Sequence, residues 1–154
     1  MRELRGILQQ AGIRAEIPAD ITAALWEKFL FVAAWGGIGA VSRAPIGVLR
    51  AMSGTRRLLE RAMQEIFNVA RARDVKLQED IVARSMGFID SLQPAATTSM
   101  QRDIAEGRPS EIEAWNGAVV RFGDEVGVDV TLHKFIYDSL QPLELNARKE
   151  ISFS

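Results

Sequence analysis

The sequence predicts an all-α domain, because apolar residues recur at helical spacing along nearly the whole chain and no convincing run alternates with the period of a strand. The clearest stretches are a long apolar one from Ile21 to about Arg43 and an amphipathic one from Ser53 to about Arg73. The chain has 154 residues, 47% hydrophobic and 25% charged, which suits one domain with its own core. We therefore expect residues 1–154 to form a single multi-helix bundle.

The N-terminal part should begin with a short amphipathic helix over Arg2–Gln10, ended by Ala11-Gly12. Residues 13–18 then read as an extended link, and Asp20 is a good N-cap for the long helix. Past Lys28 that helix is apolar on almost every side, which is typical of a helix in the middle of a bundle.

The remaining helices are bounded by turn and cap residues. Pro45 ends the long helix, because proline cannot continue the hydrogen-bond ladder. The pattern then predicts helices over the following ranges: Ile46–Met52, Ser53 to about Arg73, Gln78 to about Leu92, Ser110 to about Val126 and Thr131 to about Ala147. We expect residues 148–154 to form a disordered tail.

Composition excludes several classes of site. The sequence has no cysteine, which rules out disulfides, thiolate nucleophiles and cysteine zinc sites. His133 is the only histidine, so we expect no metal site. The formal net charge of −1 gives no basic surplus for nucleic acid. The longest apolar run, residues 29–41, is short for a membrane span and no secretory signal is visible, so we expect a cytoplasmic protein without membrane contact.

A glycine cluster, GGIGAVS at residues 36–42, loosely resembles a dinucleotide-binding fingerprint. That fingerprint works at a strand-to-helix turn, where it presents backbone N–H groups to a pyrophosphate. Here the cluster lies inside an apolar helical segment and lacks the third glycine. Close helix–helix packing, or the approach of a ligand to the backbone, is the better interpretation, and we expect no cofactor-binding residues in this chain.

Three polar residues are candidates for chemistry, each with an ordinary alternative. Lys28 leads into the core helix, where it could extend its ammonium into water or stand at the mouth of a cleft as a proton donor. Glu111 lies in a predicted first helical turn, where acids complement the helix dipole. Ser99 could be a helix cap. Taken singly, none of the three establishes a site.

Read together, these segments resemble the C-terminal domain of the ketopantoate reductase (2-dehydropantoate 2-reductase) family. The Lys28 segment, APIG at residues 44–47 and SMQRDIAEGRPSEIEAWNG at residues 99–117 follow the order and spacing of that domain, and the resemblance covers about residues 13–140. It implies a helical fold of the ketopantoate reductase and 6-phosphogluconate dehydrogenase C-terminal type. It also implies that Lys28 is the general acid, Ser99 binds substrate and Glu111 is the active-site glutamate.

Three positions depart from the family pattern. Members that act on ketopantoate tend to carry asparagines one and two turns after the lysine, where this chain has Val32 and Gly36. A further asparagine commonly follows the proline of the next segment, where this chain has Ile46. Because polar substrate contacts are replaced, we expect a different carbonyl substrate, bulkier or less polar than ketopantoate.

The resemblance implies the substrate-binding and dimerisation domain of an NADPH-dependent 2-keto acid reductase, as in pantothenate biosynthesis. Its partners would be a 2-keto acid and an N-terminal Rossmann domain that binds most of the NADPH and is absent from this chain. We expect the isolated chain to be inactive and to self-associate as a homo-oligomer through its exposed apolar face. The alternative is a stand-alone helical interaction or scaffold module that has lost catalysis.

Overall fold

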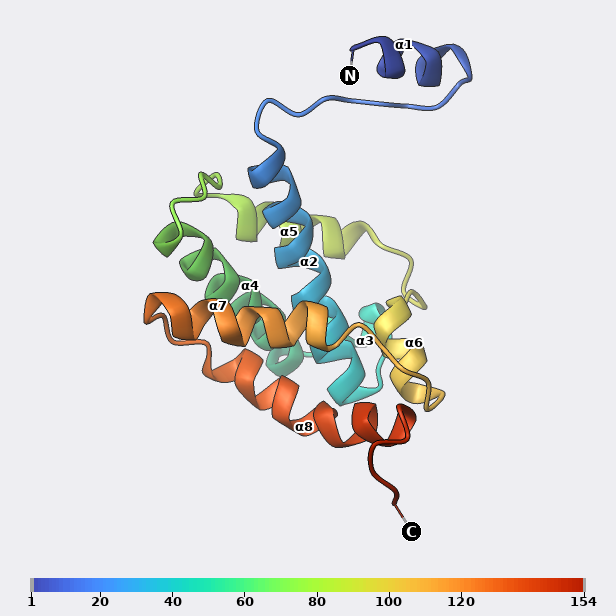
Figure 1. The fold of residues 1–154 in the computed structure, drawn as a ribbon, viewed down its shortest axis with the longest axis vertical. Coiled ribbons are helices and arrows are strands. Elements are labelled where there is room, and N and C mark those ends of the chain that lie inside the picture. Colours follow the sequence, from blue (N-terminus) through green and yellow to red (C-terminus); the bar gives the residue numbers. More distant parts are fainter. Residues whose placement is uncertain (1, 154) are drawn as a thin grey trace.

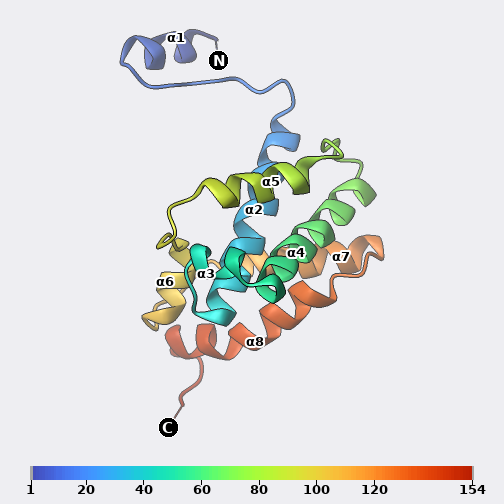
Figure 2. The same ribbon diagram turned by 180° about the vertical axis from the view of Figure 1, so that it is seen from behind.

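The computed structural model describes the backbone of residues 2–153 and the side chains of residue 3 and residues 6–153. Within these ranges all regular structure is helical, which confirms the all-α prediction (Figures 1 and 2). The elements in chain order are α1 (Arg2–Gln10), α2 (Ile21–Ser42), α3 (Ile46–Ala51), α4 (Ser53–Ala72), α5 (Ile81–Ser91), α6 (Ser99–Ala105), the π-helix η1 (Glu113–Gly117), α7 (Ala118–Val126) and α8 (Thr131–Ala147).

Helix α2 runs through the middle of the bundle, with α4, α6 and α8 packed around it (Figure 1). The Asp20 carboxylate accepts the Ala23 N–H at 3.0 Å and caps its start, as the sequence predicts. By length and composition alone α2 could cross a bilayer. In this structure its second half instead supplies the core, with residues 33–40 all buried.

The glycines of α2 allow neighbouring side chains to approach its backbone. A Cβ at Gly37 would lie 2.5 Å from Nδ2 of Asn116, and one at Gly39 would lie 2.6 Å from Oε1 of Gln101. This is the close packing that the sequence predicts for the cluster. Since these glycines are buried inside a helix, they do not fit the phosphate-cradling loop of a dinucleotide site.

Helix α1 lies apart from the bundle at the end of the extended link over residues 13–18 (Figures 1 and 2). At the other end of the chain, α8 ends at Ala147, and residues 148–153 form turns and bends. Ser154 lies outside the described residues, so the disordered tail over 148–154 stays a prediction, as does the single-domain assignment.

Two helix starts differ from the sequence prediction. α5 begins at Ile81 rather than Gln78, because residues 79–80 form a turn closed by the Ile81 N–H and the Gln78 carbonyl. The predicted helix from Ser110 is also wrong in its first turns. The N–H of Gly117 reaches the carbonyl of Ile112, five residues back, so η1 is wound more widely than an α-helix.

Candidate active site

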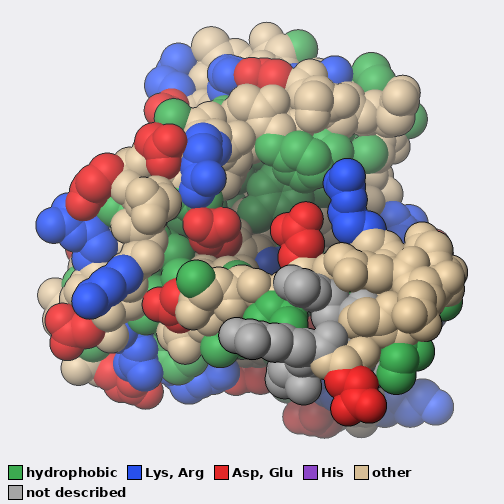
Figure 3. Space-filling model, turned by 90° about the horizontal axis from the view of Figure 1, so that it is seen from above, with side chains coloured by type: hydrophobic (Ala, Val, Ile, Leu, Met, Phe, Trp, Pro, Cys, Tyr) green, Lys and Arg blue, Asp and Glu red, His purple; other side chains and the backbone are tan. Residues whose placement is uncertain are grey.

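Helical periodicity places Ile21, Leu25, Lys28 and Val32 on one side of α2, and we call these four residues the open face. Ile21 and Leu25 are each 60% exposed, Lys28 is exposed and Val32 is half-buried. Figure 3 views the molecule from above relative to Figure 1, toward the end of the bundle where α2 begins. It shows hydrophobic side chains in a hollow bordered by acidic and basic ones. The lysine therefore stands on an otherwise apolar and accessible helix face.

An aromatic wall flanks the open face on the side of η1 and α7. Phe29 stacks on Trp115 with ring centroids 5.9 Å apart, and Trp26 contacts Phe122 at 5.8 Å. The groove along this wall has a volume of about 240 Å³ and is lined by Leu25, Trp26, Phe29, Ala114, Ala118 and Phe122. It gives the open face an apolar border.

Helix α5 forms the opposite wall. Phe31 and Phe88 lie with ring centroids 5.3 Å apart. A surface pocket of about 300 Å³ lies here, and Lys28 is one of its lining residues together with Phe31, Ile81 and Phe88. Neighbouring Glu27 pairs with Arg84 across the helices at 3.2 Å. Among the side chains that the structure describes, none forms an ion pair with Lys28, which leaves its ammonium available to a ligand.

The start of α6 closes the end of the open face nearest the C-terminus of α2, which we call its lower end. One turn beyond Val32, a Cβ at Gly36 would lie 3.0 Å from Cε of Met100 and 3.5 Å from Oγ1 of Thr98. The hydroxyl of Thr98, rather than that of Ser99, caps α6 by accepting the N–H of Gln101 at 3.1 Å. The capping alternative for Ser99 is therefore wrong. Ser99 is the first residue of α6 and is exposed.

The APIG segment holds the loop that leads into Ser99. At the N-terminus of α3, Ile46 donates its N–H to the Ala96 carbonyl at 3.0 Å, and Gly47 donates to the Pro94 carbonyl at 2.9 Å. A side chain at Gly47 would collide with Pro94, since its Cβ would lie 2.7 Å from the proline Cβ. The Ile46 side chain is fully buried, so this position faces the core rather than the open face.

Glu111 lies in the segment between α6 and η1. Its carbonyl accepts the Trp115 N–H at 3.0 Å, and its own side chain is exposed. The preceding Ser110 is buried and bonded through both its amide and its hydroxyl to Glu144 of α8. By contrast, Glu113 pairs with Arg121 and accepts the Tyr137 hydroxyl, and this hydrogen bond raises the pKa of the tyrosine. Glu111 is the freer of the two acids.

Sequence reasoning on the candidate site did not include the network that ties η1 to α2 and α8. Asn116 is fully buried, and its Nδ2 donates to the Ala33 carbonyl at 3.3 Å and to Nδ1 of His133 at 3.0 Å. Nε2 of His133 in turn donates to the Ala62 carbonyl at 3.0 Å. Burial lowers the pKa of His133 from 6.5 to about 4, so the imidazole is neutral. The sequence signal was an asparagine inside an apolar helical pattern.

The structure therefore brings the elements that carry Lys28, Ser99 and Glu111 together around α2. Ser99 starts the helix that covers Gly36, and Glu111 precedes the π-helix anchored at Ala33. Among the described residues no hydrogen bond or ion pair joins these three side chains directly. Asp103, which shares the motif with them, is instead paired with Arg108 at 2.7 Å.

The described residues form an all-helical body whose accessible face presents one lysine between apolar walls. Comparison with known proteins specifies its class. The family described as the ketopantoate reductase PanE/ApbA C terminal matches residues 20–144, which is most of the chain. The chain therefore belongs to the ketopantoate reductase family and corresponds to its C-terminal domain.

Relatives and solved structures agree with this assignment. A 2-dehydropantoate 2-reductase from Pyrobaculum aerophilum is 30% identical over 141 residues, which are 92% of this chain and 50% of the relative. The crystal structure of a PanE/ApbA family ketopantoate reductase from Ralstonia eutropha superimposes with a TM-score of 0.85 at 31% identity, covering 96% of this chain and 49% of that one. The chain thus spans about half the length of the relatives it matches.

Two further structures widen the comparison. A dimeric ketopantoate reductase from Staphylococcus aureus has a TM-score of 0.85 at 26% identity, covering 95% of this chain and 51% of that one. A D-mandelate dehydrogenase determined with NADH and anilino(oxo)acetate has a TM-score of 0.84 at 21% identity, covering 95% of this chain and 48% of that one, and it shares the fold.

Proposed function

We propose that this chain is the substrate and proton-donor half of an NAD(P)H-dependent 2-keto acid reductase. The observation that carries the proposal is the placement of Lys28 on the open face, exposed between an aromatic wall and α5. When a ketone is reduced, negative charge develops on its oxygen. An ammonium beside that oxygen stabilises the charge and then supplies the proton. In this role Lys28 is the general acid.

Ser99 and Glu111 have supporting roles in the proposal. The exposed hydroxyl of Ser99, at the start of α6, binds the carboxylate of the 2-keto acid. The exposed carboxylate of Glu111 orients the ammonium of Lys28 and keeps it charged once substrate and the second domain enclose the site. Both assignments rest on the family motif and on the arrangement of η1 and α6 around α2.

The hydride would come from a nicotinamide cofactor held by a separate Rossmann domain. The described residues of this chain offer no phosphate-binding loop, because the glycines of α2 are buried against Asn116 and Gln101. NADPH is the cofactor we propose, with the Rossmann domain docked over the open face. We also propose a cytoplasmic homodimer, in line with the dimeric reductase from Staphylococcus aureus.

Steady-state kinetics test the proposal. The complete reductase, with its Rossmann domain present, should oxidise NADPH in the presence of a 2-keto acid and show saturation in both substrates. The 154-residue chain alone should show no such activity at equal concentration. Saturable NADPH oxidation by the isolated chain, or none by the complete protein with any 2-keto acid, would contradict it.

A helical interaction module is the second candidate, and the exposed apolar residues favour it. Ile21 and Leu25 on the open face, and Phe88 on α5, are all more than half exposed. A surface of this kind usually binds another protein surface. This reading predicts no reductase turnover that Lys28→Met could remove, whereas the reductase reading predicts loss of turnover.

A further inference from the structure

The lower end of the open face has an unusual composition for a site that would receive a hydroxylated substrate. One turn after Lys28 the face presents Val32, and two turns after it Gly36, which is buried. The Cε of Met100 lies 3.0 Å from the position that a Cβ at Gly36 would occupy. Met100 is itself only 2% exposed, so its thioether fills the space next to Gly36.

The polar side-chain atoms of Thr98 and Gln101 are engaged or out of reach: Oε1 of Gln101 has no hydrogen-bond partner among the described residues, but it is buried against Gly39. Oγ1 of Thr98 would lie 3.5 Å from a Cβ at Gly36, but it caps α6 by accepting the N–H of Gln101. Nε2 of Gln101 donates to the Ala44 carbonyl at 3.0 Å. A substrate hydroxyl placed here would lose its hydrogen bonds to water. It would lie near the apolar side chains of Val32 and Met100 and near the Thr98 hydroxyl, which already caps α6. Ile46 supplies no polar contact to a substrate either, because its apolar side chain is fully buried.

We infer that the site selects 2-oxo acids whose side chain is wholly apolar, with Val32 as its specificity-determining residue and Met100 filling the space beside Gly36. The inference rests on the proposed function and names its substrate class. The carbonyl lies beside Lys28, and the branched apolar side chain of the substrate packs on Val32, while the buried Met100 thioether fills the space beside Gly36. Methionine suits this role because its flexible and polarizable side chain adapts to irregular apolar shapes.

A matched pair of substrates tests the inference directly. 4-Hydroxy-3,3-dimethyl-2-oxobutanoate and 3,3-dimethyl-2-oxobutanoate differ only by the 4-hydroxyl group. An apolar pocket should favour the second compound about 10- to 100-fold in kcat/KM, since it buries no unpaired hydroxyl. A pocket built to hydrogen-bond the hydroxyl would favour the first by as much as about 10⁴-fold. The assay uses the complete reductase with NADPH in excess.

Two variants assign the selectivity to residues. Val32→Asn places an amide on the open face, and Met100→Gln replaces the thioether with an amide of nearly the same length. Val32→Asn should raise the kcat/KM ratio of the hydroxylated over the unhydroxylated acid about tenfold or more, because the substrate hydroxyl then gains a partner, and Met100→Gln should raise it by less, because position 100 is buried. Val48→Asn is the matched control, since Val48 is exposed on α3, and it should leave the ratio unchanged. Thermal unfolding identifies any variant that has lost its fold.

The outcomes separate this inference from the proposed function. Turnover of both acids with at least tenfold preference for the unhydroxylated one, moved by Val32→Asn but not by Val48→Asn, supports the inference. Turnover with preference for the hydroxylated acid overturns the inference and leaves the proposed reductase in place. Absence of NADPH oxidation with every 2-oxo acid overturns both.

Discussion

The amide and the hydroxyl of Ser110 both donate to the carboxylate of Glu144: the hydroxyl to one oxygen at 2.6 Å, and the amide to that oxygen at 2.9 Å and to the other at 3.1 Å. Arg148, directly after the end of α8, donates to the oxygen Oε1 of Glu144 at 2.7 Å and pairs with it. Glu144 is only 6% exposed, so its charge is compensated inside the protein. Glu111 follows Ser110 directly. The contact between Ser110 and Glu144 therefore fixes the position of the Glu111 backbone at the surface of the bundle.

We expect Glu144→Ala to lower the free energy of unfolding by about 2–4 kcal/mol, since the buried donors of Ser110 would lose their acceptor. Urea unfolding of the isolated chain measures the change. Glu150→Ala, at an exposed position past the end of α8, is the control and should change stability by less than about 0.5 kcal/mol. Equal effects of the two substitutions would show that the Ser110 contact does not stabilise the fold.

Gly47 and Gly87 should respond in opposite directions to alanine. At Gly47 a Cβ would meet backbone atoms of Pro94 at 2.8 Å, so Gly47→Ala should destabilise the chain and displace the loop before Ser99. At Gly87, inside α5, a Cβ would meet nothing within 4 Å. Gly87→Ala should therefore stabilise the chain by about 0.5–1 kcal/mol. Thermal melting compares the two, and the reverse order would contradict the close approach at Gly47.

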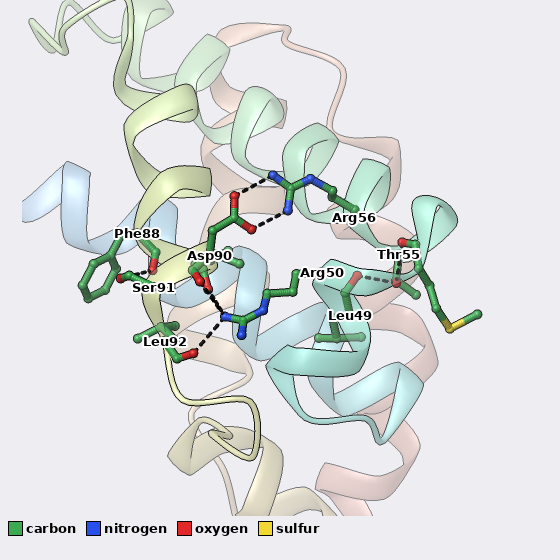
Figure 4. Close-up of polar contacts among 10 residues, drawn as sticks. Leu49, Arg50, Thr55, Arg56, Phe88, Asp90, Ser91 and Leu92 are labelled. Atoms are coloured by element: carbon green, nitrogen blue, oxygen red, sulfur yellow. Dashed lines mark hydrogen bonds and ion pairs between the residues drawn. The ribbon is translucent and has the colours of Figure 1, made fainter.

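Two arginines bind the C-terminal end of α5 (Figure 4). Arg50 donates to the carbonyls of Ile89 at 2.7 Å, Asp90 at 3.0 Å and Leu92 at 2.8 Å, at the C-terminus of the helix. Arg56 makes a paired contact with the exposed carboxylate of Asp90, at 2.6 and 2.8 Å, and this hydrogen bond lowers the pKa of Asp90.

We expect Arg50→Ala to cost about 2 kcal/mol of stability, because the part-buried contacts to the Ile89 and Leu92 carbonyls are lost. Arg56→Ala should cost less than about 1 kcal/mol, since solvent screens an exposed pair. Hydrogen exchange of the α5 amides, recorded for both variants, checks the ranking. A larger loss of protection in Arg56→Ala than in Arg50→Ala would contradict it.

His133 should remain neutral in the folded chain well below pH 6. Its folded pKa of about 4 lies below the unfolded value of 6.5, so between these values the unfolded chain binds a proton that the folded chain does not. Stability from this residue is therefore complete above about pH 6.5 and falls by about 3 kcal/mol as the pH drops to about 4. Glu65 opposes part of this loss, because burial raises its pKa.

Proton NMR checks the histidine prediction without ambiguity, since the sequence contains no other histidine. The ring signals of the folded chain should keep their neutral-form shifts from about pH 7.5 down to about pH 5. A titration midpoint near the ordinary value in the folded state would contradict the buried hydrogen-bonded imidazole.

Helical spacing was sufficient to predict the all-α class and the ends of α2 and α8. It could not predict η1, because the wide turn depends on Asn116 reaching a carbonyl of α2 and a histidine of α8 that are distant in sequence. Long-range partners of this kind leave no periodic signal. The role of the APIG segment could not be predicted from spacing either. Its hydrogen bonds go to residues 94–96, which lie beyond two intervening helices in the sequence.

Of the candidate site, the sequence placed Lys28 at the turn from amphipathic to apolar helix, and the structure has it exposed there. The motif also brought in Ser99 and Glu111, whose roles remain proposals. The sequence pattern could not predict which residue packs against Gly36. Met100 of α6 fills the space where Gly36 has no side chain, and this contact is visible only in the packing of the structure.

The most direct measurement of the central claim is the kcat of the Lys28→Met variant in the complete reductase. Loss of the proton donor should lower kcat about 10²–10⁴-fold with a much smaller change in KM. Lys134→Met, at an exposed position on α8, is the matched control and should keep the activity of the unmodified protein. A Lys28→Met enzyme with unchanged kcat would contradict the assignment of Lys28 as general acid.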